Sequence, residues 1–246
     1  MFRAYLAISL AKSLGSASLL LFLLFLCGVS WGVWDLRLSL LCALTWNAAL
    51  SLGFFVQHSV MIRRSVRRRL AGVVPPAYYG VAFAIASGIT LLAFMLLWQE
   101  SGHTVVTLRG PMRIGVRIVA LLSVAGLVWG VLALGAFDAF GTRALKAAAN
   151  GNESSPSQFM IRGPYRYVRH PLYFFTLMLI WTSPDVTAER LLFNVLWTAW
   201  IIIGTLLEER DLVAEFGGEF QEYQRRVPML VPWRLAARVV GVRAAA

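Results

Sequence analysis

Three clusters of polar side chains interrupt or follow the apolar runs of this 246-residue chain, and they hold the residue types that could do chemistry. They are the stretches Gln57–Arg63, Arg162–Tyr173 and Glu208–Asp211. Ionisable residues next to hydrocarbon are costly, and they usually pair with one another or serve a function. These three stretches are therefore the candidate functional sites.

The second and third clusters carry charge preferences that follow from helix ends. Pro171 suits the first turn of a helix, where its missing N–H costs nothing, and the free N–H groups of such a turn favour an anionic group. Glu208 and Glu209 end the last apolar run, where the helix macrodipole opposes carboxylates and favours a cationic partner. The alternative to a binding site is an arginine-rich membrane anchor with interfacial tyrosines for the second cluster, and a solvated helix end for the third.

The composition indicates an integral membrane protein. Hydrophobic residues make up 59% of the chain and charged residues 14%, and the mean hydropathy is +0.68. A water-soluble chain has about a quarter of its residues charged, so a soluble enzyme is excluded. The net charge of +11 fits basic loops between apolar runs, so no nucleic acid partner is expected. Cys27 and Cys42 lie inside apolar runs without a C-x-x-C spacing, so no metal site is expected.

The apolar runs predict an all-α polytopic membrane helix bundle with about six spans. The last two spans form a helical hairpin with a short first arm, and a C-terminal amphipathic helix and tail follow. We expect an N-terminal transmembrane part over 1–150 and a C-terminal part over 151–246 that holds the hairpin and the tail; the resemblance described below implies that this second part binds the cofactor. The predicted spans are Ser13–Trp34, Leu38–Ile62, Tyr78–Trp98, Ile118–Phe137, Pro171–Pro184 and Leu191–Leu207.

Basic residues concentrate in alternate segments: the N-terminus, the second loop, the fourth loop and the tail. The positive-inside rule then predicts that both termini are cytoplasmic. Gly126, Gly130 and Gly135 permit close helix packing within or between chains, so the oligomeric state stays open.

Two sets of motifs resemble a known superfamily. The stretch Gly163–Tyr173, with Glu208-Glu209, Phe216-Gly217, Tyr223 and Val227-Pro228, resembles the integral membrane methyltransferases, which include isoprenylcysteine carboxyl methyltransferases and phospholipid N-methyltransferases. The stretches Gln57–Arg63, Asp138–Arg143 and Glu208–Leu212 are similar to bacterial methanethiol S-methyltransferases and to membrane proteins of nitrite and nitric-oxide gene clusters. The resemblance implies a multi-pass protein of the bacterial inner membrane.

The resemblance implies S-adenosylmethionine as the cofactor. Its carboxylate suits arginine or the helix start near His170, its ammonium suits Glu208 or Glu209, and its adenine suits a tyrosine ring. No G-x-G-x-x-G follows a predicted strand, so the soluble dinucleotide-type fold is not expected. The predicted cofactor-binding residues are Tyr165, Tyr167, Val168, Arg169, His170, Pro171, Tyr173, Glu208 and Glu209.

The implied reaction needs a thiolate. A thiol has a pKa near 8.5, so a base assists methyl transfer to a small thiol such as methanethiol. We predict His58 as that base, with Gln57 beside it and with Asp138 orienting His58 or pairing with an arginine. A helix-end histidine bonded to the backbone is the alternative for His58.

Other readings remain open. A lipid amine or prenylcysteine is an alternative methyl acceptor, so the partner is a small hydrophobic or thiol substrate or a membrane lipid. Membrane sterol reductases that use NADPH share an Arg-His-Pro-x-Tyr-like stretch but usually have more spans. A transporter or a haem-binding subunit is the non-enzymatic alternative, although the chain has three histidines and haem favours histidines at facing positions.

Overall fold

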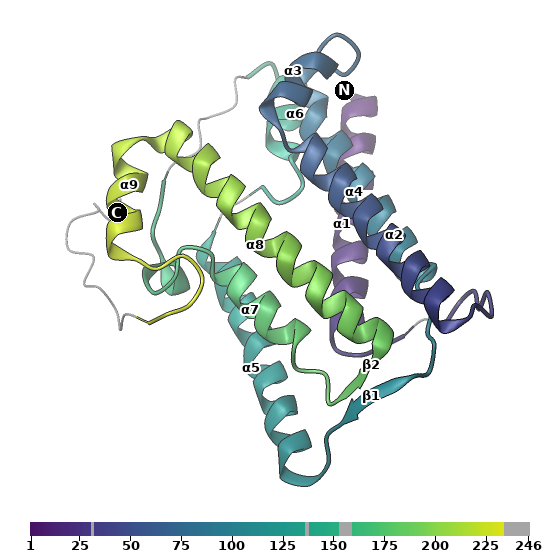
Figure 1. The fold of residues 1–246 in the computed structure, drawn as a ribbon. Coiled ribbons are helices and arrows are strands. Elements are labelled where there is room, and N and C mark those ends of the chain that lie inside the picture. Colours follow the sequence, from purple (N-terminus) through teal and green to yellow (C-terminus); the bar gives the residue numbers. More distant parts are fainter. Residues whose placement is uncertain (31, 136–137, 153–158, 234–246) are drawn as a thin grey trace. The chain divides into compact units, whose positions relative to one another are not determined.

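Helices dominate the structure, a computed structural model that describes residues 1–30, 32–135, 138–152 and 159–233 (Figure 1). The chain forms two compact units. Unit 1 comprises Met1–Val106, Phe137–Pro156 and Asp185–Trp197, and unit 2 comprises Thr107–Ala136, Ser157–Pro184 and Thr198–Ala246. The helices are α1 (Phe2–Leu26), α2 (Leu40–Met61), α3 (Arg64–Leu70), η1 (Pro76–Tyr78), α4 (Tyr79–Leu96), α5 (Gly110–Ala133), α6 (Thr142–Ala149), η2 (Gly163–Arg166), α7 (Pro171–Ile180), α8 (Ala188–Phe216) and α9 (Gly218–Arg226), and the strands are β1 (Thr104–Thr107) and β2 (Asp185–Thr187).

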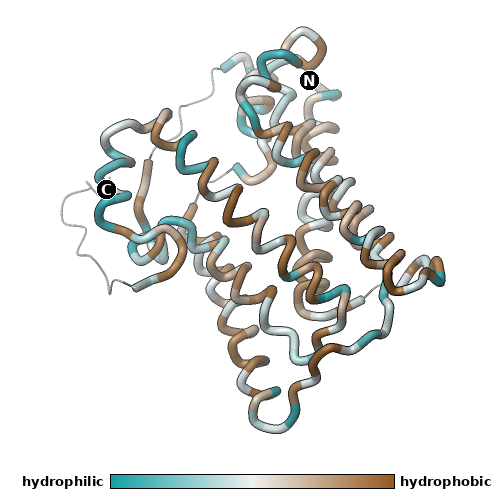
Figure 2. The backbone as a smooth tube through the Cα atoms, in the orientation of Figure 1, coloured by the Kyte–Doolittle hydropathy of each residue, from teal (hydrophilic) through white to brown (hydrophobic). Residues whose placement is uncertain are grey.

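Among the described residues, five helical segments are long and apolar enough to cross a membrane. They are α1, α2, the segment Pro76–Leu96, α5 and α8. The shorter α7 has 10 residues and is about 15 Å long, half of a hydrocarbon core of about 30 Å. Figure 2 shows hydrophobic residues along these helices. The predicted all-α polytopic fold is confirmed, with five candidate spans in place of about six and the shorter α7 where the short fifth span was predicted.

Several predicted helix boundaries were wrong. The first helix spans Phe2–Leu26 rather than Ser13–Trp34, because Gly28 with φ at +92° follows its end, and α5 begins at Gly110 rather than Ile118. The apolar runs were delimited by charged residues, but lysine and arginine are good helix formers, so a helix continues through them. The last helix likewise continues to Phe216 instead of ending at Leu207.

In unit 1, α4 packs against both α1 and α2. Small residues make the contact with α1 close, because Ala4 and Ala11 are buried against Val81 and Ala84. The start of α6 is close to α4 as well. A Cβ atom on Gly80 would lie 2.6 Å from the carbonyl oxygen of Gly141, so this contact requires glycine.

A hydrogen-bonded pair holds the end of α4 to α2. The buried side chain of Asn47 donates to the carbonyl oxygen of Gln99 at 2.7 Å and accepts from its N–H at 2.9 Å. The first turn of α8 is held to α1, because Arg190 donates to the carbonyl oxygens of Phe25 and Leu26 at 3.0 and 2.7 Å.

In unit 2, α5 packs against α7 and η2. Gly126 faces the ring of Phe175 and Gly130 faces Leu172, with no room for a Cβ atom at either glycine. These two glycines therefore permit close packing within the chain, as small residues do in membrane helices. The predicted amphipathic C-terminal helix is α9, whose Phe220 and Tyr223 are buried with Val227.

Candidate functional site

The site in unit 2 is built around the start of α7. Pro171 occupies the first turn of this helix and His170 precedes it, as the sequence predicted. The His170 side chain is buried, and its ring stacks on Tyr173 with centroids 5.6 Å apart and planes 9° apart. Proline fixes the backbone here, so the histidine and the tyrosine one turn later share a side of the helix.

The tail after α9 runs beside the start of α7. The N–H of Arg169 donates to the carbonyl oxygen of Pro228 at 2.9 Å, and the N–H of His170 donates to that of Met229 at 3.1 Å. These two hydrogen bonds hold the two residues immediately before α7 to the tail. The Val-Pro-Met motif thus has a structural function, which is to fix the entry to α7.

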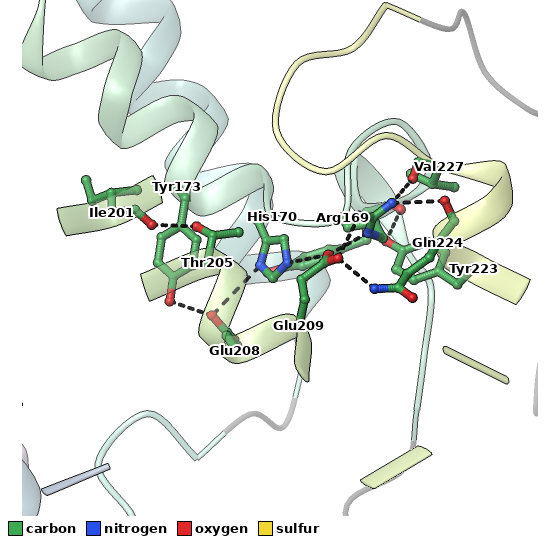
Figure 3. Close-up of polar contacts among 11 residues, drawn as sticks. Arg169, His170, Tyr173, Ile201, Thr205, Glu208, Glu209, Tyr223, Gln224 and Val227 are labelled. Atoms are coloured by element: carbon green, nitrogen blue, oxygen red, sulfur yellow. Dashed lines mark hydrogen bonds and ion pairs between the residues drawn. The ribbon is translucent and has the colours of Figure 1, made fainter. Parts of the chain in front are cut away.

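Glu209 is the centre of a buried ion-pair network (Figure 3). Arg169 binds its carboxylate in a bidentate manner, with Nε to Oε1 at 2.6 Å and Nη2 to Oε2 at 2.7 Å. His170 Nε2 lies 3.0 Å from Oε1, and Gln224 Nε2 donates to Oε2 at 2.7 Å. Arg169 also donates to the carbonyl oxygens of Gln224 and Val227. The carboxylate of Glu209 is therefore held by three side chains.

Glu208 has a different environment from its neighbour. Its side chain is 44% exposed, against 10% for Glu209. One oxygen accepts a hydrogen bond from the Tyr173 hydroxyl at 2.8 Å and lies 3.9 Å from His170 Nδ1. Glu208 thus presents an accessible carboxylate beside two aromatic rings.

The sequence analysis placed Glu208 and Glu209 at the end of the last helix and predicted a cationic partner for that reason, and this placement was wrong. Because α8 continues to Phe216, both glutamates precede its last turn, beyond the range of the macrodipole. The cationic partner predicted for this pair exists: it is Arg169, two residues before α7, which binds Glu209.

Tyr165 lies close enough to Glu208 for the two to interact. Burial and the negative charge of Glu208 raise the pKa of the Tyr165 hydroxyl to about 12. The backbone carbonyl of Tyr165 accepts a hydrogen bond from Tyr223 at 2.5 Å. Tyr173 and His170 thus lie against the Glu208 carboxylate, and Tyr165 lies within the range of its charge.

Two other predicted residues lie at the edge of this arrangement. Tyr167 contacts Trp129 of α5, with ring centroids 6.2 Å apart, and is 42% exposed. Val168 is buried. A direct role of either side chain in binding remains a prediction.

A second polar cluster lies in unit 1, between α2 and α4. His58 Nδ1 lies 3.3 Å from the Ser87 hydroxyl, which also contacts Gln57 Nε2 at 3.4 Å. The Thr90 hydroxyl donates to Gln57 Oε1 at 2.8 Å. Ring contacts with Phe54 and Phe83 flank the imidazole at 5.4 and 5.0 Å. The structure thus joins the predicted His58 and Gln57 through a serine of α4.

Asp138 lies at the start of α6. Its carboxylate accepts hydrogen bonds from the Thr142 hydroxyl at 3.1 Å and from the N–H of Arg143. Burial raises the pKa of Asp138, but these hydrogen bonds outweigh burial and hold the pKa below its ordinary value. The conformation of Gly141, with φ at +61°, lets the chain turn back toward the aspartate. This bonding gives Asp138 a helix-capping function.

Three residues of these clusters were missed by the sequence analysis. Ser87 and Thr90 are polar residues three positions apart in an apolar helix, a spacing that places them on one face and could have identified them. Gln224 gave no signal, because its partner Glu209 lies 15 residues away on a different helix.

The arrangement in unit 2 joins an accessible carboxylate, aromatic rings and a buried ion pair at the start of a helix, and comparison with known proteins defines its class. The chain is 38% identical over 191 residues to methanethiol S-methyltransferase 2 of Bradyrhizobium diazoefficiens, covering 75% of this chain and 71% of that protein. It is 34% identical over 186 residues to the methanethiol S-methyltransferase of a Pseudomonas species (74% and 70%) and 31% identical over 181 residues to that of Mycobacterium tuberculosis (73% and 74%). No family model and no solved structure matches the chain.

The fold and the matched proteins define an integral membrane methyltransferase. The identity to these relatives and the length that it covers place the chain in the family of the methanethiol S-methyltransferases.

Proposed function

We propose that this protein transfers a methyl group from S-adenosylmethionine to a small thiol such as methanethiol. The observation that carries the proposal is the difference in burial and bonding between the carboxylates of Glu208 and Glu209. Glu209 is held by Arg169, His170 and Gln224, whereas Glu208 is accessible beside Tyr173. One buried ion pair fixes the site and one accessible carboxylate is left to bind a cation.

The residues present fit the cofactor. Its ammonium would be held by the Glu208 carboxylate, and its adenine would lie against the ring of Tyr165 or Tyr173. Arg169 is already bonded to Glu209, so we assign the cofactor carboxylate to the first turn of α7 rather than to this arginine. When bound, S-adenosylmethionine supplies a methyl group on a positively charged sulfur.

His58 is the proposed base for the acceptor thiol. In its neutral form the imidazole has one nitrogen that accepts a proton, and the Ser87 contact at Nδ1 fixes the orientation of the ring. The acceptor thiol would give its proton to the free nitrogen of His58, which would leave a thiolate as the nucleophile for the methyl group that S-adenosylmethionine would supply. Gln57 positions the serine that His58 contacts.

Asp138 is proposed as a positioning residue. Its carboxylate bonds the start of α6, and we infer that it acts on the reaction through that helix rather than through contact with the substrate. We also propose a location in the bacterial inner membrane with both termini in the cytoplasm, on the positive-inside distribution of arginines.

The test uses the full-length protein reconstituted in lipid vesicles with S-adenosylmethionine labelled in its methyl group. Methanethiol, larger thiols, a phospholipid amine and a prenylcysteine are offered as separate acceptors. We expect label in dimethyl sulfide, and loss of that label in the Glu208→Gln variant at low cofactor concentration. Label confined to the lipid or prenylcysteine products would overturn the thiol assignment. Thermal stabilisation by NADPH but not by S-adenosylmethionine would overturn the methyl-donor assignment.

A further inference from the structure

An apolar groove of about 680 Å³ runs along unit 2. Its walls come from α5 and α7, with contributions from α8 and from the tail, and Figure 1 shows α5 beside α7. The volume lies within the range of ligand sites, about 300–1,000 Å³. The lining residues of α5 and of the loop before it are Leu108, Met112, Gly115, Val116 and Val119.

The polar side-chain groups among the lining residues are already bonded within the chain. The Thr182 hydroxyl donates to the carbonyl oxygen of Leu179 at 2.7 Å, and the Trp181 indole N–H donates to the Thr198 hydroxyl at 3.0 Å. Met112, Trp181 and Ile202 are exposed at its edges. Because α5 and α8 are membrane-spanning by length and composition, this surface favours a hydrocarbon chain over water.

A row of arginines follows one border of the same groove. Arg113 and Arg117 are spaced by four residues and share one side of α5, and Arg109 is the residue immediately before this helix. Each arginine directly follows a groove-lining residue, namely Leu108, Met112 and Val116 respectively. Arg113 donates to the carbonyl oxygen of Leu108 at 3.3 Å, and Arg109 and Arg117 are exposed.

The charge around this row is positive. The sequence has no aspartate or glutamate from residue 101 to residue 137. One carboxylate comes from Asp185, which follows Pro184, and the Pro184 carbonyl accepts a hydrogen bond from Leu108 at 2.8 Å. Three arginines against one aspartate leave a net positive border. On the predicted topology this segment is outside, where the positive-inside rule disfavours arginine.

We propose that this groove binds an anionic phospholipid, with an acyl chain against α5 and α7 and the phosphate beside Arg109 and Arg117. The groove supplies the apolar surface, and the arginine row supplies the charge that distinguishes an anionic from a zwitterionic lipid. From Met112 to Val119 the groove follows about 10 Å of helix, which accommodates part of one chain. None of the groove-lining residues is among those assigned to the cofactor, and the proposal does not rest on the proposed function.

The test measures lipid binding directly. Full-length protein, delipidated in a neutral detergent, is titrated with dioleoyl phosphatidylglycerol or dioleoyl phosphatidylcholine, and bound lipid is quantified by native mass spectrometry. We expect phosphatidylglycerol to bind at least about tenfold more tightly. An arginine beside an anionic headgroup contributes about fivefold in affinity, so the double variant R109Q/R117Q should bind phosphatidylglycerol about 25-fold more weakly and phosphatidylcholine as before.

Two further variants separate the groove from general surface charge. R68Q/R69Q removes two exposed arginines of α3 in unit 1 and should leave phosphatidylglycerol binding unchanged. A side chain at Gly115 meets open space, so the leucine of Gly115→Leu should fill part of the groove without unfolding the protein. The binding of both lipids should then weaken by at least about fivefold. Glycerol phosphate, which has the charge without the chains, should not compete.

Four results would overturn the proposal. They are equal affinity of the wild type for the two lipids, an equal loss in the α3 control, unchanged lipid binding in Gly115→Leu, and competition by glycerol phosphate at the lipid's own concentration.

Discussion

Substitution of each glutamate in turn separates binding from stability. Glu208 and Glu209 are adjacent in sequence and have the same chemistry, yet the first is 44% exposed and the second 10%. Glu208→Gln keeps an oxygen that can accept from Tyr173 and removes the negative charge. Glu209→Gln removes the charge that Arg169 binds through two hydrogen bonds.

The two variants should differ in the kind of defect as well as in its size. A hydrogen bond to a charged group contributes about 1.5–3 kcal/mol, and exposure favours the lower limit, so Glu208→Gln should weaken cofactor binding about tenfold. Leaving the buried Arg169 side chain without its anionic partner costs about 3–5 kcal/mol. Glu209→Gln should therefore lower the stability of the folded protein by about that amount.

Calorimetric titration with S-adenosylmethionine and thermal unfolding in the same detergent measure both quantities. We expect Glu208→Gln to change Kd with an unchanged Tm, and Glu209→Gln to lower Tm by several degrees. Glu219→Gln, at an exposed position of α9, is the control and should change neither. The reasoning is refuted if Glu208→Gln binds the cofactor like the wild type, or if Glu209→Gln keeps the wild-type Tm.

Three further substitutions test the remaining assignments. His58→Ala should lower kcat at least about 100-fold with unchanged cofactor Kd, because a general base contributes about 10²–10⁴-fold; a wild-type kcat would exclude His58 as the base. Asp138→Ala should lower the free energy of unfolding by about 1 kcal/mol through lost capping. Because the pKa of Asp138 is lowered in the folded state, its stabilisation is present above the ordinary pKa of 3.8 and is lost as pH falls below that value. The unfolding curves of variant and wild type should therefore converge at acid pH, and a constant difference would contradict this. Gln224→Ala removes one donor to Glu209 and should cost about 1 kcal/mol and speed proteolysis within α9, and an unchanged digestion rate would argue against this contact.

The positions of the helices followed from the apolar runs, whereas their ends did not. Hydrocarbon requires apolar side chains, so a run without charges marks where a helix can cross the membrane. Helix ends depend instead on backbone signals, and α5 begins at Gly110-Pro111 although two arginines follow within the helix. Charged residues delimit the hydrocarbon and not the helix, and this difference accounts for the wrong boundaries at Ser13 and Ile118.

The polar cluster of unit 1 shows a related limit. His58 and Gln57 were identifiable because polar side chains are rare in an apolar run. Their partners Ser87 and Thr90 belong to α4, and only the packing of α2 against α4 brings the two helices together. A single sequence gives the facing residues of each helix but not which helices are neighbours, so the serine that orients His58 emerges only in three dimensions.

The Glu208-Glu209 pair could be recognised in the sequence, but the sequence could not show which glutamate is buried and which is accessible. Consecutive residues of an α-helix point about 100° apart, so Glu208 and Glu209 point in different directions and meet different faces of the site, with only the His170 ring near both carboxylates. One must turn toward the interior, where a buried charge requires a counter-ion and several donors, and the other toward the open side. The sequence contains both the cation and the anions, but the choice between the two glutamates depends on the rotation of α8 against α7. Since Arg169 and His170 lie against Glu209, that rotation leaves Glu208 as the carboxylate available to a ligand, and a helix rotated by one residue would exchange their functions.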